Sequence, residues 1–126
     1  MIAVIIQFSG TLMFSQDFKV NSLELGYGKD RTSSISSGDI DSDGDIDLII
    51  ANGRHWPGQN KILLNNGLGR FTVEKNLGIN RMTSYAAELG DLNGDGYVDV
   101  LSANDMDDKI AWYKNDNSSS KKAGSR

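Results

Sequence analysis

The sequence contains no cysteine, a single proline and a single histidine. The lack of cysteine excludes disulfide bonds, thiolate metal sites and cysteine nucleophiles. One histidine cannot supply the paired imidazoles that zinc and copper sites commonly use. No long segment carries an apolar stripe at helical spacing, whereas glycine is frequent, with 14 residues. These features favour one domain of short strands joined by turns within the 126 residues.

The chain also lacks the motifs of common enzymes and of nucleic-acid-binding proteins. No serine lies in a nucleophile-elbow pattern, and no glycine-rich phosphate loop is present. The only histidine, His55, has no evident orienting partner. The formal net charge of −4 argues against nucleic acid, which requires a clustered basic face. We therefore expect a chain that is not an enzyme and does not bind nucleic acid.

The first 16 residues, Met1–Gln16, are mostly apolar and carry no charged side chain. They are too few for a membrane span, which needs about 20 apolar residues, so no span is expected. They are similar to the apolar and cleavage regions of a secretory signal peptide whose basic region is missing. The alternative is a buried strand at 2–6. The signal interpretation predicts an extracellular or periplasmic protein whose mature structure starts near Asp17.

Acidic residues are concentrated in two windows, the first acidic loop (39–47) and the second acidic loop (91–99). Of the 17 acidic residues, five lie in the first loop and three in the second. Crowding like charges so closely is unfavourable unless a cation neutralises them. The two windows are therefore candidate metal sites.

The acidic loops belong to an internal repeat. Gly38–Asp47 recurs as Gly90–Asp99, with an offset of 52 residues. Further matches join 51–52 to 103–104, 61–62 to 109–110, and 17–20 to 70–73. The residues 17–116 are thus predicted to form two structural repeats.

Each repeat predicts short strands, because apolar and β-branched runs end at glycine and asparagine turns. In the first repeat the expected strands are 32–38, 46–51, 61–65 and 70–74, and in the second they are 83–90, 98–103 and 109–114. One extra strand, 17–25, comes before the first repeat, and the tail 117–126 is expected to be disordered.

We therefore predict an all-β fold of β-propeller blades, each built from four antiparallel strands. A four-stranded unit repeated at about 40–50 residues is typical of such blades, and propellers need about 4–8 of them to close. About two blades plus one extra strand make an incomplete propeller. The chain is expected to be either part of a longer protein or one member of a homo-oligomer that forms the ring together.

Oxygen ligands at alternate positions of the acidic loops predict two calcium sites. Calcium takes six to eight oxygens, and carboxylates spaced along a tight loop supply them. Because Asn93 replaces a carboxylate with a neutral oxygen, the second site should be weaker. The candidate ligands are Asp39, Asp41, Asp43, Asp45 (carbonyl) and Asp47 in the first loop, and Asp91, Asn93, Asp95, Tyr97 (carbonyl) and Asp99 in the second.

An EF-hand or a dockerin is the main alternative for these loops. The EF-hand pattern requires a bidentate glutamate at position 12, where this chain has Ile50 and Ser102. Both classes also place a helix after the loop, whereas Asp47 is followed by Leu-Ile-Ile-Ala-Asn, a β-branched run closed by Asn-Gly. The sequence therefore excludes a helical calcium motif.

The order of motifs resembles that of the FG-GAP/VCBS repeat family, which includes the propeller of integrin α subunits. The matching elements are Gly-Asp-x-Asp-x-Asp-Gly-x-x-Asp, an apolar strand ending in Ala-Asn, and Leu-Leu-Asn-Asn-Gly-x-Gly-x-Phe. The segment 109–116 is similar to the third strand and turn of a VCBS blade. The resemblance implies an extracellular or periplasmic propeller with calcium in the loops between first and second strands. It departs in the missing last strand and names no ligand.

Two functions follow as expectations. The first is a calcium-binding scaffold for extracellular adhesion or recognition of a protein or carbohydrate ligand. The second is the non-catalytic propeller portion of a secreted carbohydrate-active enzyme such as a polysaccharide lyase. For both functions two roles of calcium are open. Calcium either stabilises the loop or bridges to an oxygen atom of the partner.

Three further groups of residues leave alternatives open. The connection 53–59 is four residues longer than its counterpart, so Arg54 and Trp56 either hold a sugar or carboxylate or form a turn whose tryptophan packs on the next blade. Trp112 and Tyr113 alternate, so one should face the core and the other the solvent. The acidic turn Asp105, Asp107 and Asp108 is either solvated or a third metal site.

Overall fold

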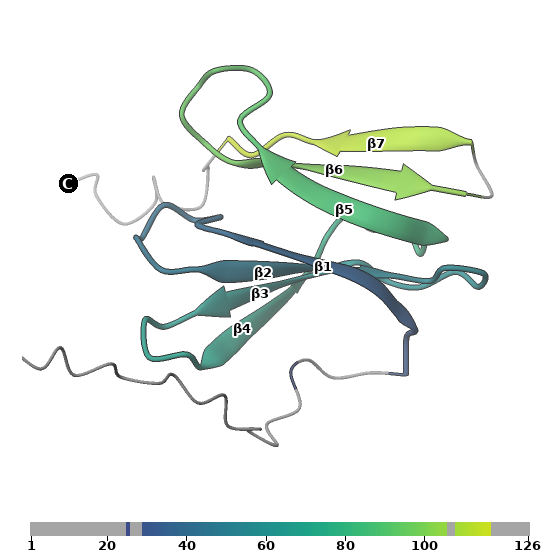
Figure 1. Ribbon diagram of the computed structural model, residues 1–126, viewed down its shortest axis with the longest axis horizontal. Coiled ribbons are helices and arrows are strands. Elements are labelled where there is room, and N and C mark those ends of the chain that lie inside the picture. Colours follow the sequence, from purple (N-terminus) through teal and green to yellow (C-terminus); the bar gives the residue numbers. More distant parts are fainter. Residues whose placement is uncertain (1–24, 26–28, 106–107, 117–126) are drawn as a thin grey trace, which may run out of the picture.

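The computed structural model describes residue 25 and residues 29–105 and 108–116. These residues form seven strands and no helix, arranged as two antiparallel sheets (Figure 1). The predicted all-β fold of incomplete propeller blades is confirmed. No helix in this part of the chain is long and apolar enough to cross a membrane. The expected leader 1–16, the tail 117–126 and all but the last residue of the extra strand 17–25 lie outside the described residues.

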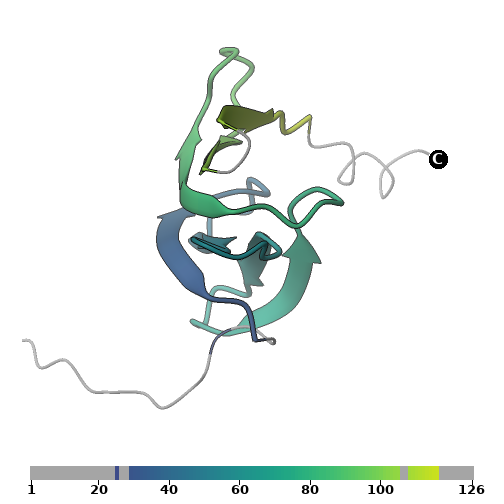
Figure 2. The same ribbon diagram turned by 90° about the vertical axis from the view of Figure 1, so that its right-hand side faces the viewer.

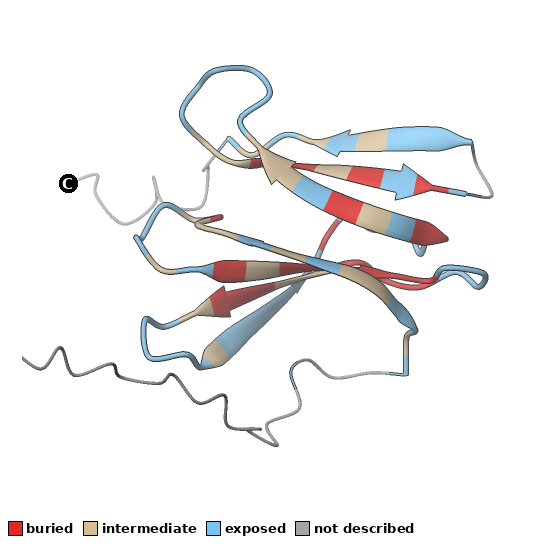
Figure 3. Ribbon diagram, viewed as in Figure 1, coloured by how far each residue is buried: buried red, intermediate tan, exposed pale blue. Residues whose placement is uncertain are grey.

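The first sheet has four strands in sequence order and corresponds to one complete blade. Its second strand is buried along almost its whole length, whereas the fourth strand is mostly exposed (Figure 3). The buried strand is the apolar run after the first acidic loop, and the exposed strand is at the edge of the sheet. The strands are β1 (Thr32–Gly38), β2 (Asp47–Asn52), β3 (Lys61–Asn65) and β4 (Phe71–Asn76), within two residues of the predicted bounds.

The second sheet repeats the first three strands of the first sheet, including their register. Gly38 pairs with Asp47 at the end of β1, and Gly90 pairs with Asp99 at the same place in the second sheet. The outer ends of both pairings carry the same irregularity, between 32 and 34 and between 84 and 86. The repeat is therefore one of backbone geometry as well as of sequence. The strands are β5 (Ser84–Gly90), β6 (Asp99–Asn104) and β7 (Lys109–Tyr113).

The hydrophobic core lies between the two sheets. Ile49 and Ala51 from β2 pack with Ala87 from β5 and Val100 from β6, and all four side chains are buried. Tyr113 of β7 packs against this cluster, whereas Trp112 is 52% exposed, as the alternation predicted. Neither sheet could bury this face alone, so the two blades stabilise each other by burying apolar surface.

The serine-rich strand β1 lies beside β5, where the two sheets come closest (Figure 2). Ser33 Oγ donates to the Ser84 carbonyl at 2.6 Å, and Ser36 Oγ donates to the Ala87 carbonyl at 2.7 Å. Small hydroxyl side chains allow the two backbones to approach and donate hydrogen bonds to carbonyls of the neighbouring strand. The serines of β1 thus let it pack closely against β5.

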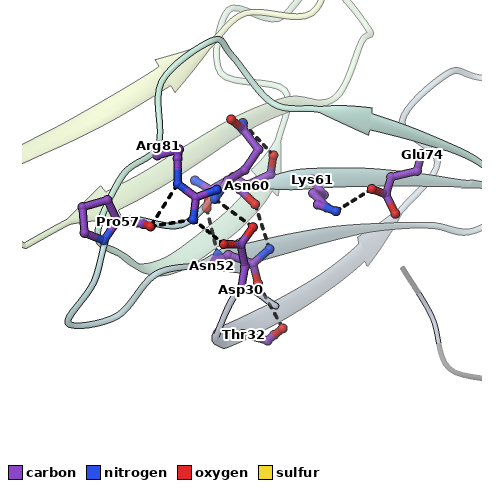
Figure 4. A network of polar contacts seen from close by, with 9 residues as sticks. Asp30, Thr32, Asn52, Pro57, Asn60, Lys61, Glu74 and Arg81 are labelled. Carbon is purple, nitrogen blue, oxygen red and sulfur yellow. Dashed lines mark hydrogen bonds and ion pairs between the residues drawn. The ribbon is translucent and has the colours of Figure 1, made fainter. Parts of the chain in front are cut away.

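A buried polar network joins the sheets at the end opposite the acidic loops. The Asn60 amide nitrogen donates to Ser84 Oγ at 2.7 Å, and Ser84 Oγ donates to Asn104 Oδ1 at 2.7 Å. Asn60 Oδ1 accepts the Asn52 backbone N–H at 2.8 Å, close to the contacts drawn in Figure 4. Such a network favours one relative position of the blades, because any shift leaves buried polar groups unpaired.

Candidate metal centres

Both acidic loops lie at the same end of the sheets and share an unusual backbone. The first joins β1 to β2 and the second joins β5 to β6. Gly44 and Gly96 occupy equivalent positions with φ of 92° and 87°, a region that favours glycine. Two positions earlier, Ser42 and Gly94 also have positive φ, at 63° and 72°. The two loops therefore fold alike, with tight turns at equivalent positions.

The first aspartate of each loop holds the turn closed through backbone amides. Asp39 accepts N–H groups from Asp43 at 3.1 Å and Gly44 at 3.0 Å. Asp91 accepts the equivalent N–H group of Gly96 at 2.8 Å, and that of Gly94 at 2.8 Å. These hydrogen bonds hold the carboxylates of Asp39 and Asp91 in a fixed orientation without any ligand.

Three carboxylates converge in the first acidic loop. Asp39, Asp41 and Asp43 each offer one oxygen, and these oxygens lie within 4.8 Å of one another. Asp41 Oδ1 is buried and has no hydrogen-bond partner among the residues that the structure describes. Burial, together with the charges of the neighbouring Asp47, Asp43 and Asp39, raises the pKa of Asp41. An orphaned oxygen among repelling carboxylates is the donor set that a hard divalent cation fits.

In the second acidic loop the carboxylate of Asp95 is paired with neighbouring side chains. Asn93 donates its amide to Asp95 Oδ2 at 2.8 Å, and Lys114 Nζ lies 3.7 Å from the same oxygen. The backbone N–H of Tyr97 and the Asn93 amide lower the pKa of Asp95. In the described residues no third carboxylate joins Asp91 and Asp95 as closely as in the first loop. Since Asp95 already has cationic and amide partners, the second loop fits a cation less well.

The last aspartate of each loop has a second role that sequence reasoning did not assign. Asp47 is fully buried, and its two oxygens accept the N–H groups of Ile40 at 2.9 Å and Asn65 at 2.8 Å. Asp99 is equally buried and accepts N–H groups from Leu92 at 3.2 Å and Asn115 at 2.8 Å. A carboxylate has about four acceptor sites, so a metal bond remains available. These aspartates therefore tie each loop to the third strand of its own sheet.

Asn65 and Asn115 contact the acidic loops, which the sequence prediction missed. Asn65 Nδ2 donates to the Ile46 carbonyl at 3.0 Å, at the end of the first loop. Asn115 Nδ2 donates to the Val98 carbonyl at 3.1 Å and also to the Ile40 carbonyl of the other repeat at 2.8 Å. The available signal was the asparagine at or just after the end of the third strand in each repeat. These hydrogen bonds hold the end of each loop in place, and the bond from Asn115 to Ile40 links the second blade to the first loop.

The seventh position of the first loop is oriented by a neighbouring turn. A Cβ atom on Gly67, in the β3–β4 turn, would lie 2.8 Å from Asp45 Oδ2. The Asp45 carboxylate therefore lies against that turn, consistent with the prediction that its carbonyl is the ligand. For the carbonyl of Tyr97, in the second loop, the same role remains a prediction.

The other candidate residues lie away from the loops. Trp56 is 66% exposed, so the expectation that it packs on the neighbouring blade is wrong for the two described sheets. His55 Nδ1 lies 3.0 Å from the Tyr85 hydroxyl, a partner contributed by β5. Asp105 and Asp108 are exposed and, among the described residues, form no carboxylate cluster; Asp107 lies outside these residues.

Comparison with known proteins adds one finding. The family model described as FG-GAP-like repeat matches residues 39–102. The match starts at the first candidate ligand, Asp39, and ends at Ser102 within β6. Searches of curated proteins and of solved structures gave no match.

Proposed function

We propose that this chain, which belongs to the FG-GAP-like repeat family, is a calcium-binding β-propeller segment that serves as an extracellular adhesion or recognition scaffold. The observation that supports calcium most directly is the convergence of Asp39, Asp41 and Asp43, with Asp41 Oδ1 buried and without a partner in the described part of the chain. No catalytic step is assigned to these carboxylates, because a bound cation would keep them ionised.

Calcium would act by removing repulsion that the fold builds into the first acidic loop. Asp39, Asp41 and Asp43 would supply carboxylate oxygens, with the Asp45 carbonyl and Asp47 completing the set. The second loop would use Asp91, Asn93, Asp95, the Tyr97 carbonyl and Asp99. Extracellular modules bind calcium with dissociation constants of about 10⁻⁴ to 10⁻³ M, which suits a secreted protein. The expected location therefore remains the extracellular space or the periplasm.

Calcium titration is the test of this proposal. Isothermal titration into chelated protein should show two sites, the tighter one in the first loop. At a free calcium concentration of about one hundred times the dissociation constant, one site should add about 2.7 kcal/mol to the free energy of unfolding. Thermal unfolding with and without EDTA checks this value. An unchanged melting temperature and no heat of binding would contradict the calcium proposal.

The variant Asp41→Asn separates charge repulsion from metal binding. Without calcium it should stabilise the chain by up to about 0.5 kcal/mol, because one of several crowded charges is removed. With calcium it should lose the tighter site. The matched variant Asp95→Asn, at an exposed loop position partnered by Lys114, should gain no such stability in EDTA and should lose only the weaker site. If both variants or neither stabilised the chain in EDTA, the proposed difference in charge repulsion between the two loops would be contradicted.

In the part of the chain that the structure describes, the second sheet has a free edge at β7. Among the described residues β7 has no further strand at its outer edge, and Ile110 and Trp112 are 76% and 52% exposed. We propose that a strand from another copy of the chain or from further repeats completes this blade. In light scattering with calcium, a defined oligomer that Ile110→Lys reduces to monomer would support another copy. A monomer at all concentrations would assign the missing strand to further repeats.

An exposed tryptophan favours a second candidate function. Trp56 stands on the long β2–β3 connection, and exposed aromatic rings are common at binding surfaces. The second candidate is the non-catalytic propeller portion of a secreted carbohydrate-active enzyme such as a polysaccharide lyase. Binding of a polysaccharide by this chain would fit this candidate and also the carbohydrate recognition included in the first, whereas binding of a protein ligand would favour the first.

A further inference from the structure

A pocket of about 250 Å³ lies at the end of the first sheet opposite the acidic loops. Three segments that are distant in sequence form it: residues 29–31 before β1, the β2–β3 connection, and the β4–β5 connection. Its polar and aromatic lining comes from Lys29, Asp30, Arg31, Trp56, Pro57 and Arg81. The pocket shares no residue with the proposed calcium sites.

The pocket is positively charged in a chain whose net charge is −4. Lys29, Arg31 and Arg81 face a single acidic residue, Asp30. That residue is already engaged, because Oδ1 pairs with Arg81 and Oδ2 accepts the Gln59 N–H at 3.3 Å. Lys29 and Arg31 have no ion-pair partner among the described residues. An excess of cationic groups around a concave site predicts an anionic ligand.

Arg81 is held in place before any ligand binds. Its Nε and Nη2 donate to the Pro57 carbonyl at 3.2 and 2.9 Å, and Nη2 also pairs with Asp30 at 2.5 Å (Figure 4). The two N–H donors of Nη1 have no partner in the described part of the chain. A planar guanidinium fixed in this way is suited to a carboxylate, because little conformational entropy is lost on binding.

Trp56 is presented by a connection with a rigid base. Gly58 and Met82 exchange two backbone hydrogen bonds of 2.8 Å, which tie the β2–β3 and β4–β5 connections together. Gly53 donates its N–H to the Arg31 carbonyl at 2.8 Å. An indole ring that is 66% exposed on such a base offers an apolar face beside the cationic groups. The apolar face of a sugar ring can stack on it, and the charged rim can bind an acidic substituent.

We propose that this pocket binds an acidic sugar unit, a uronate within a polysaccharide. The sugar ring stacks on Trp56, and the carboxylate binds to Arg81 with support from Lys29 and Arg31. The pocket volume suits one sugar unit, and the open side allows a chain to continue. The inference gives a ligand class to the recognition role proposed above and rests on that role, but not on calcium binding.

Tryptophan fluorescence of the full chain tests the proposal. In the variant Trp112→Phe the remaining tryptophan is Trp56, so its emission reports on the pocket alone. Titration with oligogalacturonate, in calcium and in EDTA, should give a saturable change in emission. The fully methyl-esterified oligomer, which lacks the charge, should bind at least about tenfold more weakly. Equal binding of both forms, or no binding by a folded chain, would overturn the proposal.

Paired variants separate the pocket from overall charge. The double variant Lys29→Gln/Arg31→Gln should weaken oligogalacturonate binding about tenfold. The matched double variant Arg70→Gln/Lys75→Gln removes the same charges from the exposed β3–β4 hairpin and should bind as the parent does. Equal losses in both would show nonspecific attraction and overturn the site.

Acidic peptides are the competing ligand class. Polyglutamate should bind more weakly than oligogalacturonate and leave Trp56 emission unchanged, since it has no sugar ring to stack. Polyglutamate binding as tight as that of the sugar would overturn a uronate site. Calcium titration of the same protein without any oligogalacturonate or polyglutamate, which bind calcium themselves, distinguishes this failure from failure of the calcium proposal, because the two sites share no residues.

Discussion

Replacing Asp47 with alanine is expected to destabilise the chain by about 3–5 kcal/mol, even in the absence of calcium. The Asp47 carboxylate is fully buried and accepts backbone N–H groups from Ile40 and Asn65. Its loss leaves two amides without partners, one of them in a buried bond and the other in a partly buried one. It also removes one of the two connections between the first acidic loop and the end of β3 and leaves only the bond from Asn65 Nδ2 to the Ile46 carbonyl. Urea denaturation in EDTA measures the loss.

The control for this prediction lies in the same loop. Asp43 is exposed, and its carboxylate caps the N–H of Asp45 at 2.9 Å. In EDTA, Asp43→Ala should therefore cost no more than about 1 kcal/mol. In calcium both variants should lose the tighter site. If Asp47→Ala were as mild as Asp43→Ala in EDTA, Asp47 would serve the metal alone and its buried hydrogen bonds would contribute little to stability.

Gly53→Ala is the second substitution with a large expected effect, a loss of about 4 kcal/mol or more. Gly53 has φ of 122°, a conformation that residues with a side chain rarely adopt. A Cβ atom there would lie 2.3 Å from the Met82 carbonyl oxygen and 2.8 Å from the Trp56 carbonyl oxygen. Both obstacles are backbone atoms, so the connection itself must move. Thermal and urea denaturation measure the loss.

Gly69→Ala separates the two causes. Gly69 has φ of 71°, but a Cβ atom there would meet nothing within 4 Å. Its substitution should cost about 1–2 kcal/mol, the usual penalty for a left-handed backbone. A difference of about 2 kcal/mol or more between the variants would report the backbone clash at Gly53. Equal losses would show that the connection yields without cost, contrary to the rigid base described for Trp56.

The two ends of the first sheet differ in charge. The end with the acidic loops presents crowded carboxylates whose repulsion a bound cation would relieve, and the buried Asp47 connects the first loop to the neighbouring β3. The opposite end presents cationic groups and an exposed indole around a pocket. A scaffold stabilised by metal at one end can keep a binding surface in shape at the other, because the strands between them are packed in one core.

The sequence determined the repeat, the strand order and the candidate ligands. Strand bounds differ from prediction by at most two residues, and β1 and β3 agree at both ends. These features are local: alternating or continuous apolar runs form strands, and the spacing of aspartates around Gly44 and Gly96 sets the turns. Local patterns are visible because neighbouring residues alone decide them.

Tertiary structure decided which residues that are distant in sequence form hydrogen bonds with one another. Asp47 meets Asn65, Asn115 meets Ile40, and Asn60 meets Ser84 only after the strands have paired and the sheets have packed. The pocket likewise forms only when Arg81 hydrogen-bonds to Asp30 and Pro57, which are distant in sequence. The sequence carries no spacing rule for such pairs, because their geometry depends on the register and packing of whole sheets. The sequence alone predicts that the second loop is the weaker site, because Asn93 replaces a carboxylate. The folded chain adds that Asp41 Oδ1 is buried without a partner in the described residues, whereas Asp95 is paired with Asn93 and Lys114.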